Sequence, residues 1–225
     1  MSGSEKLNYQ GELSTRLRVK LSLLCNPERY HLSSISKEDA RSWFREYLIT
    51  AHSIIRSSVP LMRAAHLQCS SVLDKQDLLI KLQDYFKSHI NEERGHDDWI
   101  LEDLEVIGIP RCECLERKPP QIVAELVGTQ YYWIYHWHPV SLLGYISFLE
   151  GNPPRDEWIR HLRKTTEYPE AAFRTIVMHS ELDPCHRDDL DELLDTLPLT
   201  IEQKHWIINN ALYSAKKFHD IWHPP

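Results

Sequence analysis

The sequence predicts an all-α protein, a bundle of about seven helices. Apolar residues recur at steps of three and four over long stretches, which is the period of an α-helix. Glycine is scarce, with 7 in 225 residues, and no alternating apolar and polar run indicates a strand. The length fits a single domain over residues 1–225 that can bury a core, and we expect 1–10 to be a flexible N-terminus.

The N-terminal third of the chain predicts two helices. The first covers about 13–24, where the apolar residues keep the helical period. The second begins after Ser36, a helix-capping residue with Asp39 three positions further on. Pro60 lies within this second stretch, and we expect a kink there because proline removes a helical hydrogen bond.

Five more helices are predicted downstream. One long helix covers about 71–107, and four others begin near residues 120, 155, 168 and 200. Pro139 and Pro184 are expected to break the helical pattern. Thr200 and Gln203 form the capping box of the last helix.

Composition restricts the partners and the compartment. The net charge of −7 argues against a nucleic-acid partner, which would require a basic surface. No apolar run approaches the roughly 20 residues that span a bilayer, and the N-terminus lacks the apolar stretch of a signal peptide. The 5 cysteines are scattered, as in a reduced intracellular protein. We therefore expect a cytoplasmic protein acting on a small molecule, with no nucleic-acid or membrane partner; a homodimer remains open.

The first of three polar motifs that suggest a metal site follows residue 88, in a chain with 13 histidines. Glu93 and His96 form an E-x-x-H pair, and on a helix these two side chains share one face. Glu92 and His89 lie on nearly the same face and are alternates for Glu93. The alternative interpretation is a solvated charged face, since acidic and basic residues crowd this stretch.

The other two motifs add two histidines and two carboxylates. His179, Asp183 and His186 follow at steps of four and three on a largely apolar helix, where three polar groups are costly unless they are paired or bind metal. Glu150 ends the apolar stretch 140–149, where it could cap a neighbour, face solvent or bridge two metals. Imidazole and carboxylate suit Fe(II), Mn(II) or Zn(II). A histidine pair bonded to acidic neighbours is the alternative interpretation.

Taken together, the motifs resemble those of the haem-oxygenase-like di-iron oxidases. The resemblance rests on the stretch EERGHDDWILEDLEVIG, on H-x-x-x-D-x-x-H, and on PVSLLGYISFLEG. The last is similar to the family's P-x-x-x-L-G-Y-x-x-x-L-E-G signature. The resemblance covers roughly residues 79–194, about half of the chain. It implies a haem-oxygenase-like bundle of seven helices around a cavity, with two Fe ions, no haem, and O₂ as co-substrate.

The resemblance also implies a set of iron ligands. They are Glu93, His96, Glu150, His179, Asp183 and His186, with Glu92 and His89 as alternates for the first. Glu150 and Asp183 are the expected catalytic residues, because a flexible carboxylate such as Glu150 can shift between terminal and bridging positions. Many family members take a further glutamate from the preceding helix. No acid lies around Val59, so either the ligand set is reduced or His52 or His66 compensates.

The implied activity is O₂-dependent oxidation of a carboxylate-bearing small molecule, preferably an amino acid, through a peroxo-diiron intermediate. Arg56 and Arg63 are candidates for binding the carboxylate, and pairing with surface acids is the alternative. Tyr135 and Trp137 are candidates for surrounding an apolar or aromatic side chain, and core packing is the alternative. If they do surround it, a tryptophan-derived amino acid converted to a nitrile becomes the favoured substrate.

Three other functions remain open. One is an oxidase of the same family that cleaves a C–C bond of a fatty acid or an aliphatic amino acid. Another is a related all-α hydrolase with a nucleophilic cysteine, for which Cys185 is the candidate beside His186. The third is a non-enzymatic helical protein that binds haem or another cofactor, which would leave Glu150 and Asp183 as unexplained buried charges.

Overall fold

The computed structural model describes residues 12–24, 36–71 and 77–222, and every structural statement below refers to these. The described residues form eleven α-helices and two short 3₁₀ helices, with no strand, which confirms the predicted all-α class. None of these helices is long and apolar enough to cross a membrane. The expected flexible N-terminus, residues 1–10, lies outside the described residues.

The helices follow one another with short connections. The α-helices are α1 (Leu13–Leu24), α2 (Lys37–Ile55), α3 (Ser58–Ser71), α4 (Asp77–Glu92), α5 (His96–Val106), α6 (Arg111–Glu116), α7 (Gln121–His136), α8 (Leu142–Glu150), α9 (Asp156–Thr166), α10 (Arg174–Thr196) and α11 (Ile201–Trp222). The 3₁₀ helices are η2 (Pro139–Ser141) and η3 (Glu170–Phe173).

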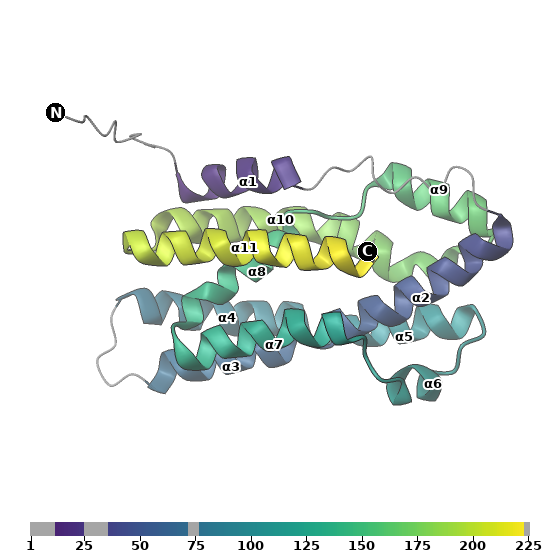
Figure 1. Ribbon diagram of the computed structural model, residues 1–225, viewed down its shortest axis with the longest axis horizontal. Helices are drawn as coiled ribbons and strands as arrows, with labels where there is room; N and C mark the ends of the chain where they lie inside the picture. Colours follow the sequence, from purple (N-terminus) through teal and green to yellow (C-terminus); the bar gives the residue numbers. More distant parts are fainter. Residues whose placement is uncertain (1–11, 25–35, 72–76, 223–225) are drawn as a thin grey trace.

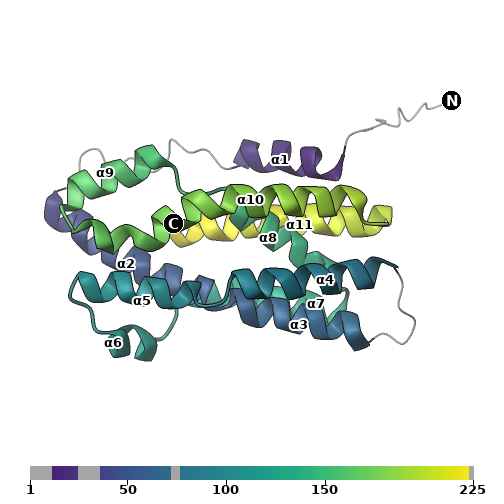
Figure 2. The same ribbon diagram turned by 180° about the vertical axis from the view of Figure 1, so that it is seen from behind.

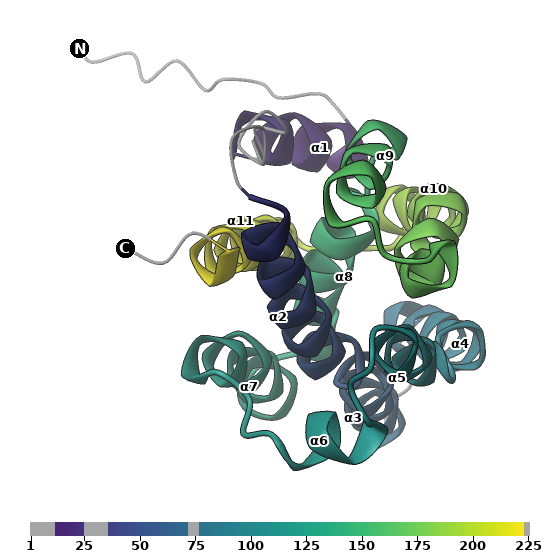
Figure 3. The same ribbon diagram turned by 90° about the vertical axis from the view of Figure 1, so that its right-hand side faces the viewer.

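Helix α8 lies in the middle of the bundle. Seen end-on in Figure 3, it runs between α10 on one side and α11 on the other, and it packs on both. Helix α1 lies along the outer side of α10 and α11, while α3, α4 and α7 occupy the opposite side (Figures 1 and 2). A central helix surrounded in this way can bring Glu150, its last residue, into the interior.

Close packing of α8 on α11 requires a glycine. A Cβ atom on Gly144 would lie 2.2 Å from the carbonyl oxygen of Ile207 and 2.9 Å from the backbone nitrogen of Ala211. Both are backbone atoms, so neither can move aside as a side chain would. Gly144 therefore sets how close α8 comes to α11, and with it the position of the α8 end that carries Glu150.

The predicted helix starts are confirmed at two places. The Ser36 hydroxyl accepts the Asp39 backbone N–H at 3.1 Å, which caps α2. At α11 the Thr200 hydroxyl accepts the N–H of Gln203 at 3.1 Å, and the Gln203 side chain accepts the N–H of Thr200 at 2.9 Å. This reciprocal pair is the predicted capping box.

Two prolines act differently from the prediction. The second predicted helix does not kink at Pro60 but ends at Ile55, and Pro60 lies in the first turn of α3, where its missing N–H costs little. Pro184 does not interrupt α10, which continues to Thr196. Its missing N–H removes the helical donor for the carbonyl of Ser180.

The single helix predicted over 71–107 is wrong. Helix α4 ends at Glu92 and α5 begins at His96, because Gly95 adopts a left-handed conformation with φ of 90° that a helix cannot contain. Glu93 therefore lies in a turn. Its carboxylate meets the ring of His96 across this turn, and not along one helix face as the E-x-x-H spacing had suggested.

Candidate metal centre

Six buried or half-buried side chains gather into two groups of three. In each group, one ligand atom per residue lies within 4.8 Å of the others. The first group, the His179 triad, consists of Glu93, His96 and His179. The second group, the His186 triad, consists of His89, Glu150 and His186. The structure thus brings together five of the six predicted ligands, with His89 as the sixth member in place of Asp183.

Four segments supply these side chains. His89 lies in the last turn of α4, and Glu93 follows in the turn that Gly95 closes. His96 opens α5, and Glu150 ends α8. Helix α10 contributes one histidine to each triad, with Pro184 between them.

The His186 triad is held by internal ion pairs. His89 donates from Nε2 to the Glu150 carboxylate and from Nδ1 to Oε2 of Glu92, the latter at 3.1 Å. His89 and Glu150 are 4% and 6% exposed, so this contact is shielded from water. Burial opposes a charge on His89, but the hydrogen bond and the charge of Glu150 outweigh it and raise the pKa of His89 to about 9. His186 meets the His89 ring edge-on, with centroids 5.0 Å apart.

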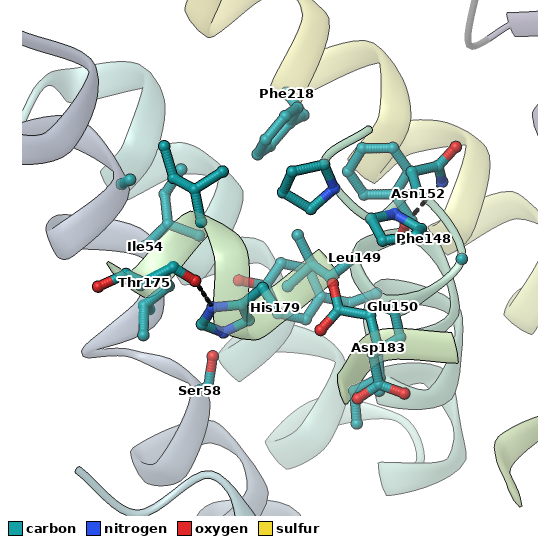
Figure 4. Close-up of a pocket in the computed structure, with 18 of the residues that line it drawn as sticks. Ile54, Ser58, Phe148, Leu149, Glu150, Asn152, Thr175, His179, Asp183 and Phe218 are labelled. Carbon is teal, nitrogen blue, oxygen red and sulfur yellow. Dashed lines mark hydrogen bonds between the residues drawn. The ribbon is translucent and has the colours of Figure 1, made fainter. Parts of the chain in front are cut away.

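The His179 triad is organised differently. His179 donates its Nδ1–H to the backbone carbonyl of Thr175 at 2.9 Å, which Figure 4 shows as a dashed line. That bond leaves Nε2 of a neutral imidazole available as a ligand. Burial lowers the pKa of His179 and favours the neutral form. His96 stands edge-on to His179 with centroids 5.1 Å apart, and its Nδ1 lies 3.2 Å from Oε2 of Glu93.

Glu93 faces both triads. Its Oε2 is close to His96, while its Oε1 lies 3.7 Å from Nδ1 of His186. Its side chain is 11% exposed, so water has little access to it. A carboxylate with one oxygen toward each group is placed as a bridge between two metals would be. The sequence suggested Glu150 for this role, whereas the structure favours Glu93.

Asp183 belongs to neither triad, although it was predicted as a ligand. It is 7% exposed and lies next to Glu150 at the same end of a cavity (Figure 4). Burial, together with the neighbouring charges of Glu150 and Glu93, raises the pKa of Asp183 to about 8. In this environment the carboxyl group holds a proton near neutral pH.

The cavity beside the triads has a volume of about 720 Å³. This is the size range of small-molecule sites, roughly 300–1,000 Å³. Glu93, Glu150, His179 and Asp183 line one part of it, and most of the remaining wall is apolar. Three aromatic side chains of the wall come from α2, α9 and α11, and they are Tyr47, Trp158 and Trp222.

The residues proposed to replace the missing acid of the preceding helix lie elsewhere. His52 is buried with its Nδ1 3.5 Å from the Cys114 sulfur, and Nδ1 of His66 lies 3.1 Å from the carbonyl of Gln83. Neither belongs to a triad. His89 takes the additional place, and its position one helical turn before Glu93 was the sequence signal for it.

The four predicted substrate-binding residues do not reach the cavity. Arg56, Arg63 and Tyr135 are exposed, and none of them lines the cavity wall. Trp137 packs against Trp206 with ring centroids 5.2 Å apart, which is the core-packing alternative. The error has a physical reason: helical spacing shows which residues share a face, but not which face meets a cavity. Tyr47, Trp158 and Trp222 were missed because they are far apart in sequence.

Several polar atoms around the triads are buried without a hydrogen-bond partner. They include Nδ1 of His96, Nδ1 of His186 and Oε2 of Glu150. The hydroxyls of Tyr85 and Tyr145 are also buried without a partner. Such groups are rare in proteins and call for a water or an ion. Mixed imidazole and carboxylate donors suit iron, manganese or zinc, so the residues present fit a pair of such ions.

The sequence matches no protein-family model and no curated protein. Solved structures do resemble the fold. A domain of unknown function with a heme oxygenase-like fold from Shewanella denitrificans OS217 superposes with a TM-score of 0.71 at 18% identity, over 94% of this chain and 90% of that one. A TenA homolog from Pseudomonas syringae pv. tomato DC3000 has a TM-score of 0.69 at 12% identity, over 95% and 96%. The chain therefore has a haem-oxygenase-like fold, as the sequence predicted.

Proposed function

We propose that this protein is a non-haem di-iron oxidase or oxygenase. The observation that carries the proposal is the pair of triads, side by side, with Glu93 between them and a small-molecule cavity beside them. Three protein ligands for each metal leave coordination positions open for O₂ or substrate. When bound, two Fe(II) ions would supply the electrons that reduce O₂.

The protein side chains have separate tasks in this proposal. Glu93 holds the two ligand groups together, and the neutral imidazole of His179 offers Nε2 without first losing a proton. His89 must give up a proton and part from Glu150 before its Nε2 can bind a metal. Asp183 holds a proton beside Glu150, where it can deliver it to a group bound in the cavity.

The substrate we infer is a carboxylate-bearing small molecule, preferably an amino acid with an apolar or aromatic side chain. Arg155 is the one Lys or Arg among the described lining residues, and it is exposed. The inner wall therefore offers no guanidinium, and a substrate carboxylate would be held by the metals. Tyr47, Trp158 and Trp222 are well placed for an aromatic side chain, so conversion of a tryptophan-derived amino acid to a nitrile stays within the proposal.

A fatty acid or an aliphatic amino acid is the second candidate substrate. The apolar wall from Ile54 to Phe148 and Phe218 would accept a hydrocarbon chain as well as a ring. Oxidative C–C cleavage of such a substrate would use the same triads. The aromatic members of the wall favour the first candidate because rings pack on rings in offset or edge-on geometry.

The hydrolase alternative lacks a nucleophile in the cavity. Cys185 is exposed, and none of the described cysteines lines the cavity wall. Similarity to a TenA homolog concerns the fold alone. A haem-binding protein would leave the carboxylates of Glu93, Glu150 and Asp183 buried in the cavity without a function.

The test is anaerobic titration with Fe(II), followed by O₂-consumption measurements with amino acids and fatty acids. We expect two irons per chain and O₂ consumption that depends on the substrate. His179→Ala should lose one iron, and His205→Ala, which removes an exposed histidine of α11, should keep both. One iron or none per chain, with substrate present, would overturn the proposal.

A further inference from the structure

Asp103 on α5 is a buried carboxylate that belongs to neither triad. It is 0% exposed and does not line the cavity. Its Oδ2 accepts the backbone N–H of Thr175 at 2.9 Å, and its Oδ1 has no hydrogen-bond partner. Burying a carboxylate with so few partners is unfavourable, so a role in stability alone does not explain the residue.

The acceptor role of Asp103 lies at the start of α10. Thr175 is the second residue of that helix, and the first N–H groups of a helix have no acceptor within it. Phe173, at the position before the helix, provides no side-chain cap. The Asp103 carboxylate therefore caps α10 from the neighbouring helix, and its charge faces the positive end of the α10 dipole.

A second hydrogen bond connects this cap to the His179 triad. The backbone carbonyl of Thr175 accepts the Nδ1–H of His179 at 2.9 Å. Thr175 is thus held through its N–H by Asp103, and it holds the imidazole through its C=O. The direction of Nε2 of His179, which faces Glu93 and His96, depends on where that carbonyl lies.

The rest of α10 is less dependent on this cap. Pro184 removes one bond of the helical ladder between His179 and His186. His186 also has contacts of its own with Glu93 and with the ring of His89. A disturbance at Thr175 should therefore reach His179 and largely spare His186.

We propose that Asp103 is a positioning residue, which aligns His179 through Thr175 and so sets the metal affinity of the His179 triad without touching it. The proposal rests on the proposed function only in requiring that both triads bind a divalent metal. Partners of metal-bound histidines commonly change metal affinity by about 10- to 100-fold when they are lost.

The test uses Co(II) as the probe and measures binding by absorbance, so no turnover is needed. His186→Ala leaves the His179 triad intact, and His179→Ala leaves the His186 triad intact. In the first background we expect Asp103→Ala to weaken Co(II) binding by about 10- to 100-fold. In the second background it should change binding by less than about twofold. Glu105→Gln, an exposed carboxylate on the same helix, is the control and should leave both affinities unchanged.

Asp103→Asn separates positioning from folding. Its amide oxygen can still accept the Thr175 N–H, so it should fold and recover part of the affinity that Asp103→Ala loses. The ¹⁵N shifts of His179 in metal-free protein give a second readout: wild type should hold the Nδ1–H tautomer, and Asp103→Ala should populate both. Equal weakening of both triads, or an unchanged tautomer and affinity, would overturn the proposal. Failure of the wild type to bind Co(II) would instead overturn the proposed function.

Discussion

The two triads contain the same kinds of ligand, yet they are prepared for metal in different ways. His179 is aligned by a hydrogen bond to a backbone carbonyl, which occupies Nδ1 and leaves Nε2 available. His89 has both ring nitrogens engaged, one by Glu150 and one by Glu92. A ligand whose second nitrogen is bonded outside the site is ready to bind, whereas one paired inside the site must first lose its partner and a proton.

The largest effect is expected at the residue that the triads share. Glu93→Gln removes the carboxylate that faces both His96 and His186. Because a direct ligand should matter more than its supporting partners, we expect Co(II) affinity to fall by about 100-fold or more at both triads. Glu150→Gln should weaken the His186 triad alone. Equal effects of the two substitutions, measured by Co(II) titration, would show that Glu93 is not shared.

The next effect concerns the backbone that carries Glu150. Gly144→Ala would place a Cβ atom 2.2 Å from the carbonyl oxygen of Ile207, so α8 and α11 must separate. We expect a loss of about 3 kcal/mol in the free energy of unfolding, and weaker metal binding at the His186 triad than at the other. Gly128→Ala on α7 is the matched control, because nothing lies within 4 Å of its new Cβ. It should stabilise the protein by up to about 1 kcal/mol in urea unfolding.

A smaller difference is expected in the order of metal uptake. The first equivalent of Co(II) should fill the His179 triad, since the His186 triad must break the contact between His89 and Glu150. We expect the His186 triad to bind about tenfold more weakly, a difference of about 1.4 kcal/mol. Parallel titrations of His186→Ala and His179→Ala measure the two sites separately. A reversed order would mean that the buried ion pair does not compete with the metal.

The smallest effect separates the cap of α10 from the triads. Burial raises the pKa of Asp103 from 3.8 to about 6, although the N–H of Thr175 partly offsets this. The folded state thus binds the proton more tightly, and the cost of charging Asp103 is absent below pH 3.8 and complete above about pH 6. Between pH 5 and pH 8 the unfolding free energy of wild type should fall by about 1–2 kcal/mol relative to Asp103→Asn. Parallel slopes for the two proteins would contradict this.

Helix starts and ligand types were predictable from the sequence because they depend on neighbours in the chain. The cap at Ser36 and the box of Thr200 with Gln203 are confirmed, and both need only three successive residues beyond the cap. The site was partly predictable, since five of the six triad residues were expected ligands. The break at Gly95 was missed, because a glycine in a periodic stretch shows its left-handed conformation only in the folded chain.

The sequence by itself determined an all-α protein and a set of histidines and carboxylates suited to metal, because helical period and donor chemistry are properties of the residues themselves. The tertiary structure decided how these ligands are shared. It paired His89 with Glu150, set Glu93 between two histidines from different helices, and placed Arg56 and Arg63 away from the cavity. These contacts join residues far apart in the chain, so they depend on how closely α8 packs against α10 and α11, which no local pattern contains.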